Sequence, residues 1–217
     1  MEFFLDTANI DQIKQAQSLG ILNGVTTNPS LMFREGIKST DLKKHYSDIC
    51  QIVDGPVSAE VISTSYQEII KEGIELAEIH PQIIIKVPMI EDGIKAIKYF
   101  KQKGIKTNCT LVFSVGQAIL AAKAGATYIS PFVGRLEDNG ENGIEIIKTI
   151  SHIYNLHGYD TKILAASIRN STHIIDCAIA GAHTITTPLH LLMELFKHPL
   201  TDKGLEKFLE DHKKNNS

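Results

Sequence analysis

The sequence has few of the features that mark secreted, membrane and metal-binding proteins. Its three cysteines are too few and too widely spaced for a disulfide framework or a cysteine-based zinc site. No apolar stretch approaches the roughly 20 residues that span a bilayer, and an acid at position 6 comes too early for a signal peptide. We therefore expect a protein of the reducing cytoplasm with no membrane contact.

Strong positive charge is also missing. The net charge is −3, and no basic run occurs that would bind nucleic acid. Nine histidines are scattered without a His-Glu-x-x-His pattern or a tight carboxylate cluster, so we expect no metal site. No Gly-x-Gly-x-x-Gly segment follows the first apolar run, which removes the usual reason to propose a dinucleotide. These absences argue against nucleic acid, a metal ion and a dinucleotide as partners.

Eight short apolar runs, each followed by a segment of helical periodicity, organise the chain. They lie at residues 2–5, 24–29, 56–61, 83–88, 105–112, 126–132, 162–167 and 183–187. Strict alternation of strands and helices predicts a parallel sheet, and eight units favour an α/β fold closed into a (β/α)₈ TIM barrel. The alternative is an open doubly wound sheet of the flavodoxin or Rossmann type. A barrel of 217 residues leaves no room for a second domain, so we expect one domain over residues 1–217.

Two further segments extend this regular pattern. Residues 134–143 are rich in Gly, Asp, Glu and Asn, and we expect a loop that acts as a connection rather than a lid. After a helix expected at residues 189–196, an extra C-terminal helix is expected at about residues 205–214.

One lysine interrupts the fourth run, Ile83-Ile84-Ile85-Lys86-Val87-Pro88. A continuous apolar run suits a strand buried on both faces, and burying an unpaired ammonium costs several kcal/mol. Desolvation would favour the free amine that carbonyl chemistry needs. The alternative is a side chain at the strand end that extends to solvent. The hexapeptide by itself does not separate the two.

Polar residues stand at the carboxyl ends of six of the other seven strands, where barrel enzymes place their chemistry. Because alternate residues of a strand share a face, each can be placed on the same side as Lys86. In chain order they are Asp6, Asn28, Glu60, Asn108 with Thr110, Ser130 with Phe132 and Arg135, and Ser167, expected above Ala165, with Arg169. Each has a simpler interpretation as a helix cap or turn former, but their common position favours a functional site.

These side chains can form and use a Schiff base. A buried amine attacks a ketone to form the imine, and a proton shuttle is then required to lose water and to break or make a C–C bond. Asp6 and Glu60 are the available carboxylates, and Thr110 can hold a water between them and the substrate.

The remaining polar groups suit a phosphorylated sugar. Asn28 and Asn108 each offer a donor and an acceptor to sugar hydroxyls. Arg135 and Arg169, each near a serine, would form an anion pocket, because the bidentate fork of arginine suits phosphate. The residues therefore predict a Schiff-base enzyme that acts on a phosphorylated sugar.

Six segments carry a more specific signal. They are residues 4–9 (Phe-Leu-Asp-Thr-Ala-Asn), 24–30 (Gly-Val-Thr-Thr-Asn-Pro-Ser), 85–88 (Ile-Lys-Val-Pro), 107–111 (Thr-Asn-Cys-Thr-Leu), 129–135 (Ile-Ser-Pro-Phe-Val-Gly-Arg) and 166–169 (Ala-Ser-Ile-Arg). Together, and in this order, they resemble the small-subunit transaldolase family, which includes the fructose-6-phosphate aldolases. The likeness runs from residue 2 to about residue 212.

The resemblance implies a class I enzyme of the pentose phosphate pathway, without metal or organic cofactor, that transfers a dihydroxyacetone unit between sugar phosphates. The donor would be sedoheptulose 7-phosphate or fructose 6-phosphate, and the acceptor glyceraldehyde 3-phosphate or erythrose 4-phosphate. Members of the family are also similar in forming rings of five or ten subunits, in which the C-terminal helix lies on a neighbour. A homo-oligomer is therefore expected.

The resemblance also implies a role for each site residue. Lys86 would form the Schiff base, Asp6 would act as acid and base in C–C cleavage, and Glu60 with Thr110 would hold the catalytic water. Further contacts would bind the two ends of the sugar: Asn28, Asn108 and Ser130 the dihydroxyacetone moiety, and Arg135, Ser167 and Arg169 the phosphate.

Glu60 and Phe132 distinguish two branches of the family. In the aldolase branch the matching residues are glutamine and tyrosine, so this sequence is of the transaldolase type at both positions. A carboxylate can manage the proton of a water where an amide cannot, and a phenylalanine withholds the hydroxyl that would favour release of free dihydroxyacetone. An aldolase is the first alternative. A non-catalytic sugar-phosphate binder is disfavoured, because both Lys86 and Asp6 are present.

Overall fold

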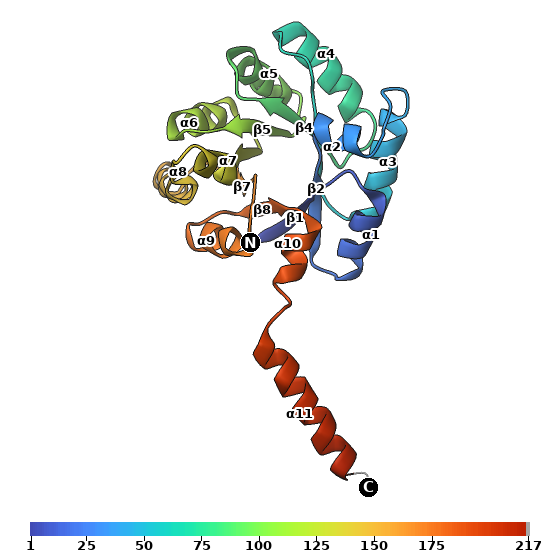
Figure 1. Ribbon diagram of the computed structural model, residues 1–217. Helices are drawn as coiled ribbons and strands as arrows, with labels where there is room; N and C mark the ends of the chain where they lie inside the picture. Colours follow the sequence, from blue (N-terminus) through green and yellow to red (C-terminus); the bar gives the residue numbers. More distant parts are fainter. Residues whose placement is uncertain (216–217) are drawn as a thin grey trace.

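Eight parallel strands close into a barrel in the computed structural model, which describes residues 1–215 (Figure 1). Each strand pairs with its neighbours in the sequence, and the last pairs with the first. The strands are β1 (Glu2–Asp6), β2 (Leu22–Thr26), β3 (Val57–Glu60), β4 (Ile83–Pro88), β5 (Thr107–Val112), β6 (Tyr128–Pro131), β7 (Lys162–Ala165) and β8 (Thr184–Thr187). The predicted (β/α)₈ barrel is confirmed. The predicted domain ends at Ser217, and residues 216–217 lie outside the described residues.

Helices surround the barrel (Figure 1). They are α1 (Ile10–Ser18), α2 (Pro29–Arg34), α3 (Leu42–Ile52), α4 (Tyr66–Ala77), α5 (Glu91–Gln102), α6 (Val115–Ala124), α7 (Val133–Asp138), α8 (Gly143–His157), α9 (Ser171–Ile179), α10 (Leu189–Glu194) and α11 (Pro199–Asn215). Several begin at asparagine or serine side chains that accept from the first turn, as at Asn9, Ser114 and Asn170.

Two short helices differ from the sequence prediction. The segment 134–143, expected to be a loop, begins within α7, because Val133 and Leu136 are buried three residues apart and anchor one helical turn. The glycines and polar residues that suggested a loop lie largely beyond that turn. Helix α2 was not predicted at all, although Asn28 caps it and proline occupies its first position.

The core has two layers because a barrel strand is buried on both faces. Inside the barrel a small cluster is formed by Phe4, Ile84, Tyr128 and Leu164. The alternate residues, such as Ile83 and Ile85, pack outward against the helices. Ile84 thus lies inside the barrel on the same face as Lys86, as predicted. Ala165, however, belongs to the outer layer, so the predicted stacking of Ser167 above Ala165 on the inner face is wrong.

A glycine makes room for the barrel interior between β1 and β2. Phe4 pairs with Gly24, and a Cβ atom at position 24 would lie 2.7 Å from the Phe4 ring. The same register brings Asp6 opposite Thr26 two residues further along both strands. The packing of Phe4 and the position of Asp6 are therefore set by one pair of strands.

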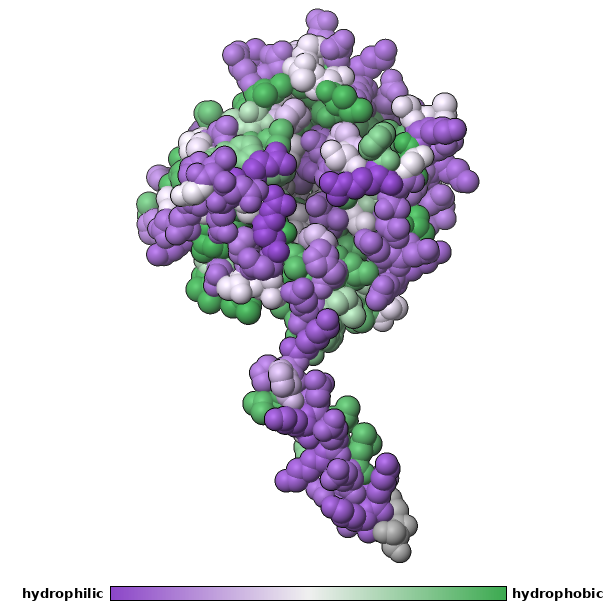
Figure 2. Space-filling view, in the orientation of Figure 1, coloured by the Kyte–Doolittle hydropathy of each residue, from purple (hydrophilic) through white to green (hydrophobic). Residues whose placement is uncertain are grey.

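Helix α11 extends away from the barrel (Figure 1). It begins at Pro199 rather than near residue 205, and none of its side chains is buried. Leu205, Phe208 and Leu209 form an exposed apolar stripe on it, visible in Figure 2. No helix among residues 1–215 is long and apolar enough to cross a membrane.

Candidate active site

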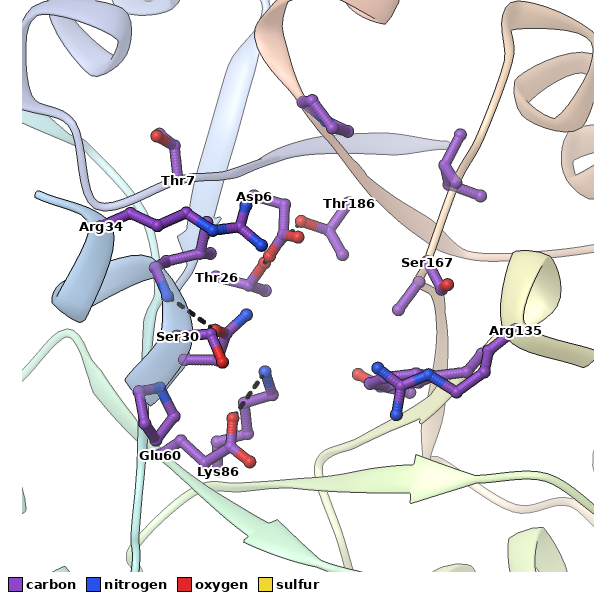
Figure 3. A pocket seen from close by; sticks show the side chains of 18 of the residues that line it. Asp6, Thr7, Thr26, Ser30, Arg34, Glu60, Lys86, Arg135, Ser167 and Thr186 are labelled. Carbon is purple, nitrogen blue, oxygen red and sulfur yellow. Dashed lines mark hydrogen bonds and ion pairs between the residues drawn. The ribbon is translucent and has the colours of Figure 1, made fainter. Parts of the chain in front are cut away.

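A cavity of about 630 Å³ opens at the carboxyl ends of the strands. It appears as a hollow among hydrophilic residues in Figure 2, and its side chains are drawn in Figure 3. Nine of the eleven residues predicted for the site line it: Asp6, Asn28, Glu60, Lys86, Ser130, Phe132, Arg135, Ser167 and Arg169. Asn108 and Thr110 do not line the cavity and are fully buried in β5.

Lys86 and Glu60 form an ion pair at the base of the cavity (Figure 3). The two strands β3 and β4 are in register at these residues, and the Lys86 Nζ lies 3.0 Å from the Glu60 Oε2. Nζ also donates to the carbonyl oxygen of Thr27 at 3.0 Å. Lys86 is only 5% exposed, so it does not extend to solvent. The carboxylate and the carbonyl offset the cost of burying the ammonium, and the side chain is held by two partners.

Thr27, the residue that carries this carbonyl, is held through its hydroxyl by the buried side chain of Tyr46. Burial raises the pKa of Tyr46 to about 12, so its hydroxyl keeps its proton. The Thr27 hydroxyl uses its only proton to donate to the carbonyl oxygen of Ser58 at 2.9 Å. It therefore accepts from the Tyr46 hydroxyl, which lies 3.1 Å away. Helix α3 thereby fixes the loop after β2 that contacts Lys86.

Asp6 is oriented by two threonines from neighbouring strands (Figure 3). The Thr26 hydroxyl donates to Asp6 Oδ1 at 2.7 Å and lies 2.6 Å from the Thr186 hydroxyl. Since Thr26 gives its only proton to the carboxylate, Thr186 must donate to Thr26. This chain of hydrogen bonds joins β8, β2 and β1 and leaves the other oxygen of Asp6 available to a ligand.

Buried amide and hydroxyl groups lie on β5 and β6 next to Lys86. Asn108 is in register with Lys86, accepts from the Ser130 hydroxyl at 2.8 Å and donates to the Ser58 hydroxyl at 3.4 Å. The Thr110 hydroxyl is buried and has no hydrogen-bond partner among the described residues. Such an orphan hydroxyl is a place where a water or ligand oxygen would be stabilised.

Asn28 has both of the roles considered from the sequence. Its side-chain oxygen accepts from the backbone nitrogen of Leu31 at 2.9 Å and caps α2. Its side-chain nitrogen is not used by the cap, and the residue lines the cavity, so the amide can still donate to a ligand.

Two arginines line the wall of the cavity across from Asp6. Arg135 lies on α7, and Arg169 lies on the loop after β7. The Arg135 guanidinium lies 4.9 Å from the centre of the Phe132 ring, and Arg169 forms a 2.7 Å ion pair with Asp138. Ser167 reaches the cavity from a left-handed backbone conformation, with φ of 59°. The strand alternation used in the sequence analysis could not place Ser167, because this conformation turns the chain after β7.

Gly134 brings α7 close to the loop that carries Ser167 and Arg169. Its nitrogen donates to the Ser167 carbonyl at 2.9 Å, and a Cβ atom there would lie 2.5 Å from the Arg169 Cγ. A second tie joins the His173 ring to Glu137 at 2.8 Å. The arginines are thus mounted on two segments that pack directly against each other.

Other chemistry finds less support in the structure. The three cysteines are buried and unpaired, and burial raises the pKa of Cys109 to about 12, which keeps it a thiol. Among residues 1–215, no three His, Cys, Asp or Glu side chains are grouped to hold a metal ion.

Sequence reasoning missed several residues of the lining, among them Thr26, Ser30, Arg34 and Thr186. Strand alternation predicts that Thr26 and Thr186 face the barrel interior. Thr26 is in register with Asp6, and Thr186 on the last strand is in register with the inward-facing Phe4. Arg34 required recognition of α2, whose Asn-Pro start is a helix signal as well as a turn signal.

Fold and cavity together define a (β/α)₈-barrel protein that can bind a small anionic ligand at the carboxyl ends of its strands, above a buried, ion-paired lysine. Comparison with known proteins gives the family. The family described as Transaldolase/Fructose-6-phosphate aldolase matches residues 3–217, and the chain belongs to that family. The resemblance seen in the sequence is thereby confirmed, and the protein is an enzyme of the transaldolase type.

Close relatives match over the full length. The chain is 63% identical over 217 residues to a probable transaldolase of Cytophaga hutchinsonii, which covers all of both chains. It is 62% identical to a probable transaldolase of Parabacteroides distasonis, again over all of both chains. A probable transaldolase of Porphyromonas gingivalis is 59% identical, over all of this chain and 99% of the other.

Proposed function

We propose that this protein transfers a dihydroxyacetone unit from a ketose phosphate to an aldose phosphate through a Schiff base on Lys86. The observation that carries the proposal is the buried Lys86–Glu60 pair at the base of an arginine-lined cavity. Glu60 is placed to accept the ammonium proton, which frees the amine for attack. The proposed donors are fructose 6-phosphate and sedoheptulose 7-phosphate, and the acceptors glyceraldehyde 3-phosphate and erythrose 4-phosphate.

The chemistry balances with the groups that are present. The amine of Lys86 attacks C2 of the ketose, and the carbinolamine loses water to give the iminium ion. Asp6 then removes the proton of the C4 hydroxyl, the C3–C4 bond breaks, and its electron pair moves into the iminium to leave an enamine. The freed aldose phosphate departs. An acceptor aldehyde is attacked by the enamine, Asp6 returns the proton, and hydrolysis releases the new ketose.

Each remaining residue of the site has a role in this proposal. The orphan hydroxyl of Thr110 would hold the water that Glu60 activates. Asn28, Asn108 and Ser130 would bind the hydroxyls of the dihydroxyacetone unit, and the buried network between the last two fixes their orientation. Arg135, Ser167 and Arg169 would bind the phosphate.

Transfer is favoured over aldol release by the environment of Phe132. Its ring packs between Phe113, at 5.6 Å, and the Arg135 guanidinium, and it places no hydroxyl beside the enamine. The enamine then lacks a hydroxyl at position 132 that would protonate its carbon and free dihydroxyacetone. An acceptor aldehyde is the remaining route for turnover.

Reduction with borohydride in the presence of fructose 6-phosphate tests the proposal. We expect a covalent adduct on Lys86, found by peptide mapping, and none in a Lys86→Met variant. An adduct on another lysine, or no adduct, would refute the Schiff base. Assays with and without erythrose 4-phosphate then separate transfer from aldol release, and rapid cleavage without an acceptor would favour the aldolase.

We also propose that the protein is a homo-oligomer, a ring of five or ten copies. The support is α11, whose apolar stripe is exposed. None of the α11 side chains is buried against the barrel of its own chain. Sedimentation of the full chain and of a variant with Leu205 and Phe208 changed to serine tests this. A wild-type monomer would refute it.

A further inference from the structure

Four lysine or arginine side chains line the cavity, and two of them already have a carboxylate partner. Lys86 is paired with Glu60 at 3.0 Å, and Arg169 is paired with Asp138 at 2.7 Å. The other two are Arg34 and Arg135. Arg135 lies over the Phe132 ring, whereas the side chain of Arg34 forms no hydrogen bond or ion pair within residues 1–215.

A phosphate ester needs more positive charge than one wall of the cavity offers. It carries about −1.5 to −2 at neutral pH and has three terminal oxygens that accept hydrogen bonds. On the wall formed by α7 and the loop after β7, Asp138 neutralises Arg169, so the net contribution of that wall is close to the single charge of Arg135. A second unpaired cation is needed to balance the dianion.

Arg34 is placed to be that cation. It lies on α2 one turn after Ser30 and three residues after Leu31, and all three line the cavity. Phe33, on the other face of α2, is 84% exposed to solvent. In the view of Figure 3 the Arg34 guanidinium reaches into the cavity on the side of Asp6, opposite Arg135.

Neighbouring acids do not occupy Arg34. Neither Asp6 nor Glu35 forms an ion pair with it: Asp6 Oδ1 accepts from Thr26 at 2.7 Å, and Glu35 Oε2 accepts from the side chain of Asn9 at 2.8 Å. The bond to Asn9 ties the end of α2 to the start of α1 and uses one oxygen of the Glu35 carboxylate. The Arg34 fork therefore remains available to an external anion.

We propose that Arg34 binds the substrate phosphate from the wall opposite Arg135, and so completes a two-sided clamp. This rests on the proposed function in that the phosphate belongs to the sugar substrate. Cations on both walls would hold the phosphate over the middle of the cavity mouth, with the carbonyl end of the sugar toward Lys86. Arg34 is then a specificity residue for phosphorylated over unphosphorylated substrates.

Binding of inorganic phosphate tests the clamp without any turnover. Titration calorimetry on the full chain would compare wild type, Arg34→Gln, Arg34→Lys and Lys38→Gln. Lys38 is an exposed cation four residues further on that does not line the cavity. We expect Arg34→Gln to weaken phosphate binding by about fivefold to tenfold, Arg34→Lys to recover part of the loss, and Lys38→Gln to bind as wild type.

Kinetics give the second measurement. In Arg34→Gln the KM for fructose 6-phosphate should rise by a similar factor, while borohydride trapping of unphosphorylated dihydroxyacetone stays at the wild-type level and shows that the barrel is intact. Phosphate binding by Arg34→Gln as tight as by wild type, an equal loss in Lys38→Gln, or no phosphate binding by wild type at millimolar concentrations would overturn the clamp. If wild type binds phosphate but no Lys86 adduct forms, the proposed function fails and the clamp does not.

Discussion

The Nζ atom of Lys86 and the Oε2 atom of Glu60 lie 3.0 Å apart on adjacent strands whose residues are in register. The lysine that interrupts an apolar strand therefore has its counter-charge built into the neighbouring strand. The same contact gives the proposed nucleophile and its proton acceptor a fixed geometry before any substrate arrives.

Glu60→Gln tests that contact. Loss of the general base should slow adduct formation on Lys86 by about a hundredfold or more. The buried ammonium would also lose its counter-charge, so the free energy of unfolding should fall. Rapid-quench borohydride trapping and urea unfolding measure the two effects. Adding Lys86→Met should restore part of the lost stability, and no recovery in the double variant would show that the pair is not energetically coupled.

Thr26→Val tests the positioning of Asp6. The variant removes the 2.7 Å hydrogen bond but keeps the shape, so C–C cleavage should slow by about tenfold, equivalent to one hydrogen bond to a charged group. Adduct formation on Lys86 should be unchanged. Thr26→Ser keeps the hydroxyl and should restore most of the rate. Equal slowing of trapping and cleavage would indicate a general distortion of the site instead.

Gly134→Ala tests the packing of α7 against Arg169. The added Cβ would collide with the Ser167 carbonyl and lie 2.5 Å from the Arg169 Cγ, which must displace the proposed phosphate ligands. We expect the KM for fructose 6-phosphate to rise by about tenfold, the worth of one charge-assisted hydrogen bond. Gly116→Ala, where the nearest atom is 4.0 Å away, is the matched control. An unchanged KM in Gly134→Ala would show that the packing of α7 against Arg169 does not affect phosphate binding.

Phe132→Tyr tests the choice between transfer and aldol release. A hydroxyl at this position would bring a proton donor next to the enamine, so the fraction of cleavage that occurs without an acceptor should rise several-fold. The ratio of dihydroxyacetone released to ketose transferred measures it. An unchanged ratio would show that Phe132 does not control the fate of the enamine.

The pair at the amino end of the barrel predicts a pH dependence of stability. Burial acts to raise the pKa of Glu2, but hydrogen bonds from Lys162 at 2.9 Å and Thr184 at 3.0 Å outweigh it and leave that pKa lowered. A lowered carboxyl pKa stabilises the fold above the unfolded value near pH 4 and loses that effect as the pH falls through the folded pKa.

Glu2→Gln should therefore be less stable than wild type at pH 7, and the difference should be smaller at pH 3. The difference should stay below about 1 kcal/mol, because both partners are more than a third exposed and solvent screens the pair. Urea unfolding at the two pH values gives the comparison. A difference that grows as the pH falls would contradict the assigned sign.

The barrel was predictable because each strand is buried on both faces and reads as a short apolar run between helices. Lys86, Glu60 and Asp6 were predictable for the same reason, since alternation along a straight strand fixes which face a residue occupies. Thr186, which completes the Asp6 chain, obeys this rule and could have been found by extending it to the last strand.

Residues beyond the strand ends were harder to place. Ser167 reaches the cavity through a left-handed conformation that no residue pattern announces. Helices α2 and α7 have six residues each, which is too short for periodicity to show. Arg34 was missed with α2, although its neighbours Asn28 and Pro29 were noted.

The hydrogen bond between Thr26 and Thr186 joins residues 160 positions apart. During synthesis, Asp6, Glu60 and Lys86 are made well before β8. A nascent chain that stops short of Thr184 therefore has these residues but lacks the Thr186 hydroxyl that completes the hydrogen bonds orienting Asp6. Full activity would then require the complete ring, because the last strand to be synthesised supplies the hydroxyl that completes the hydrogen-bond chain to Asp6 on the first strand.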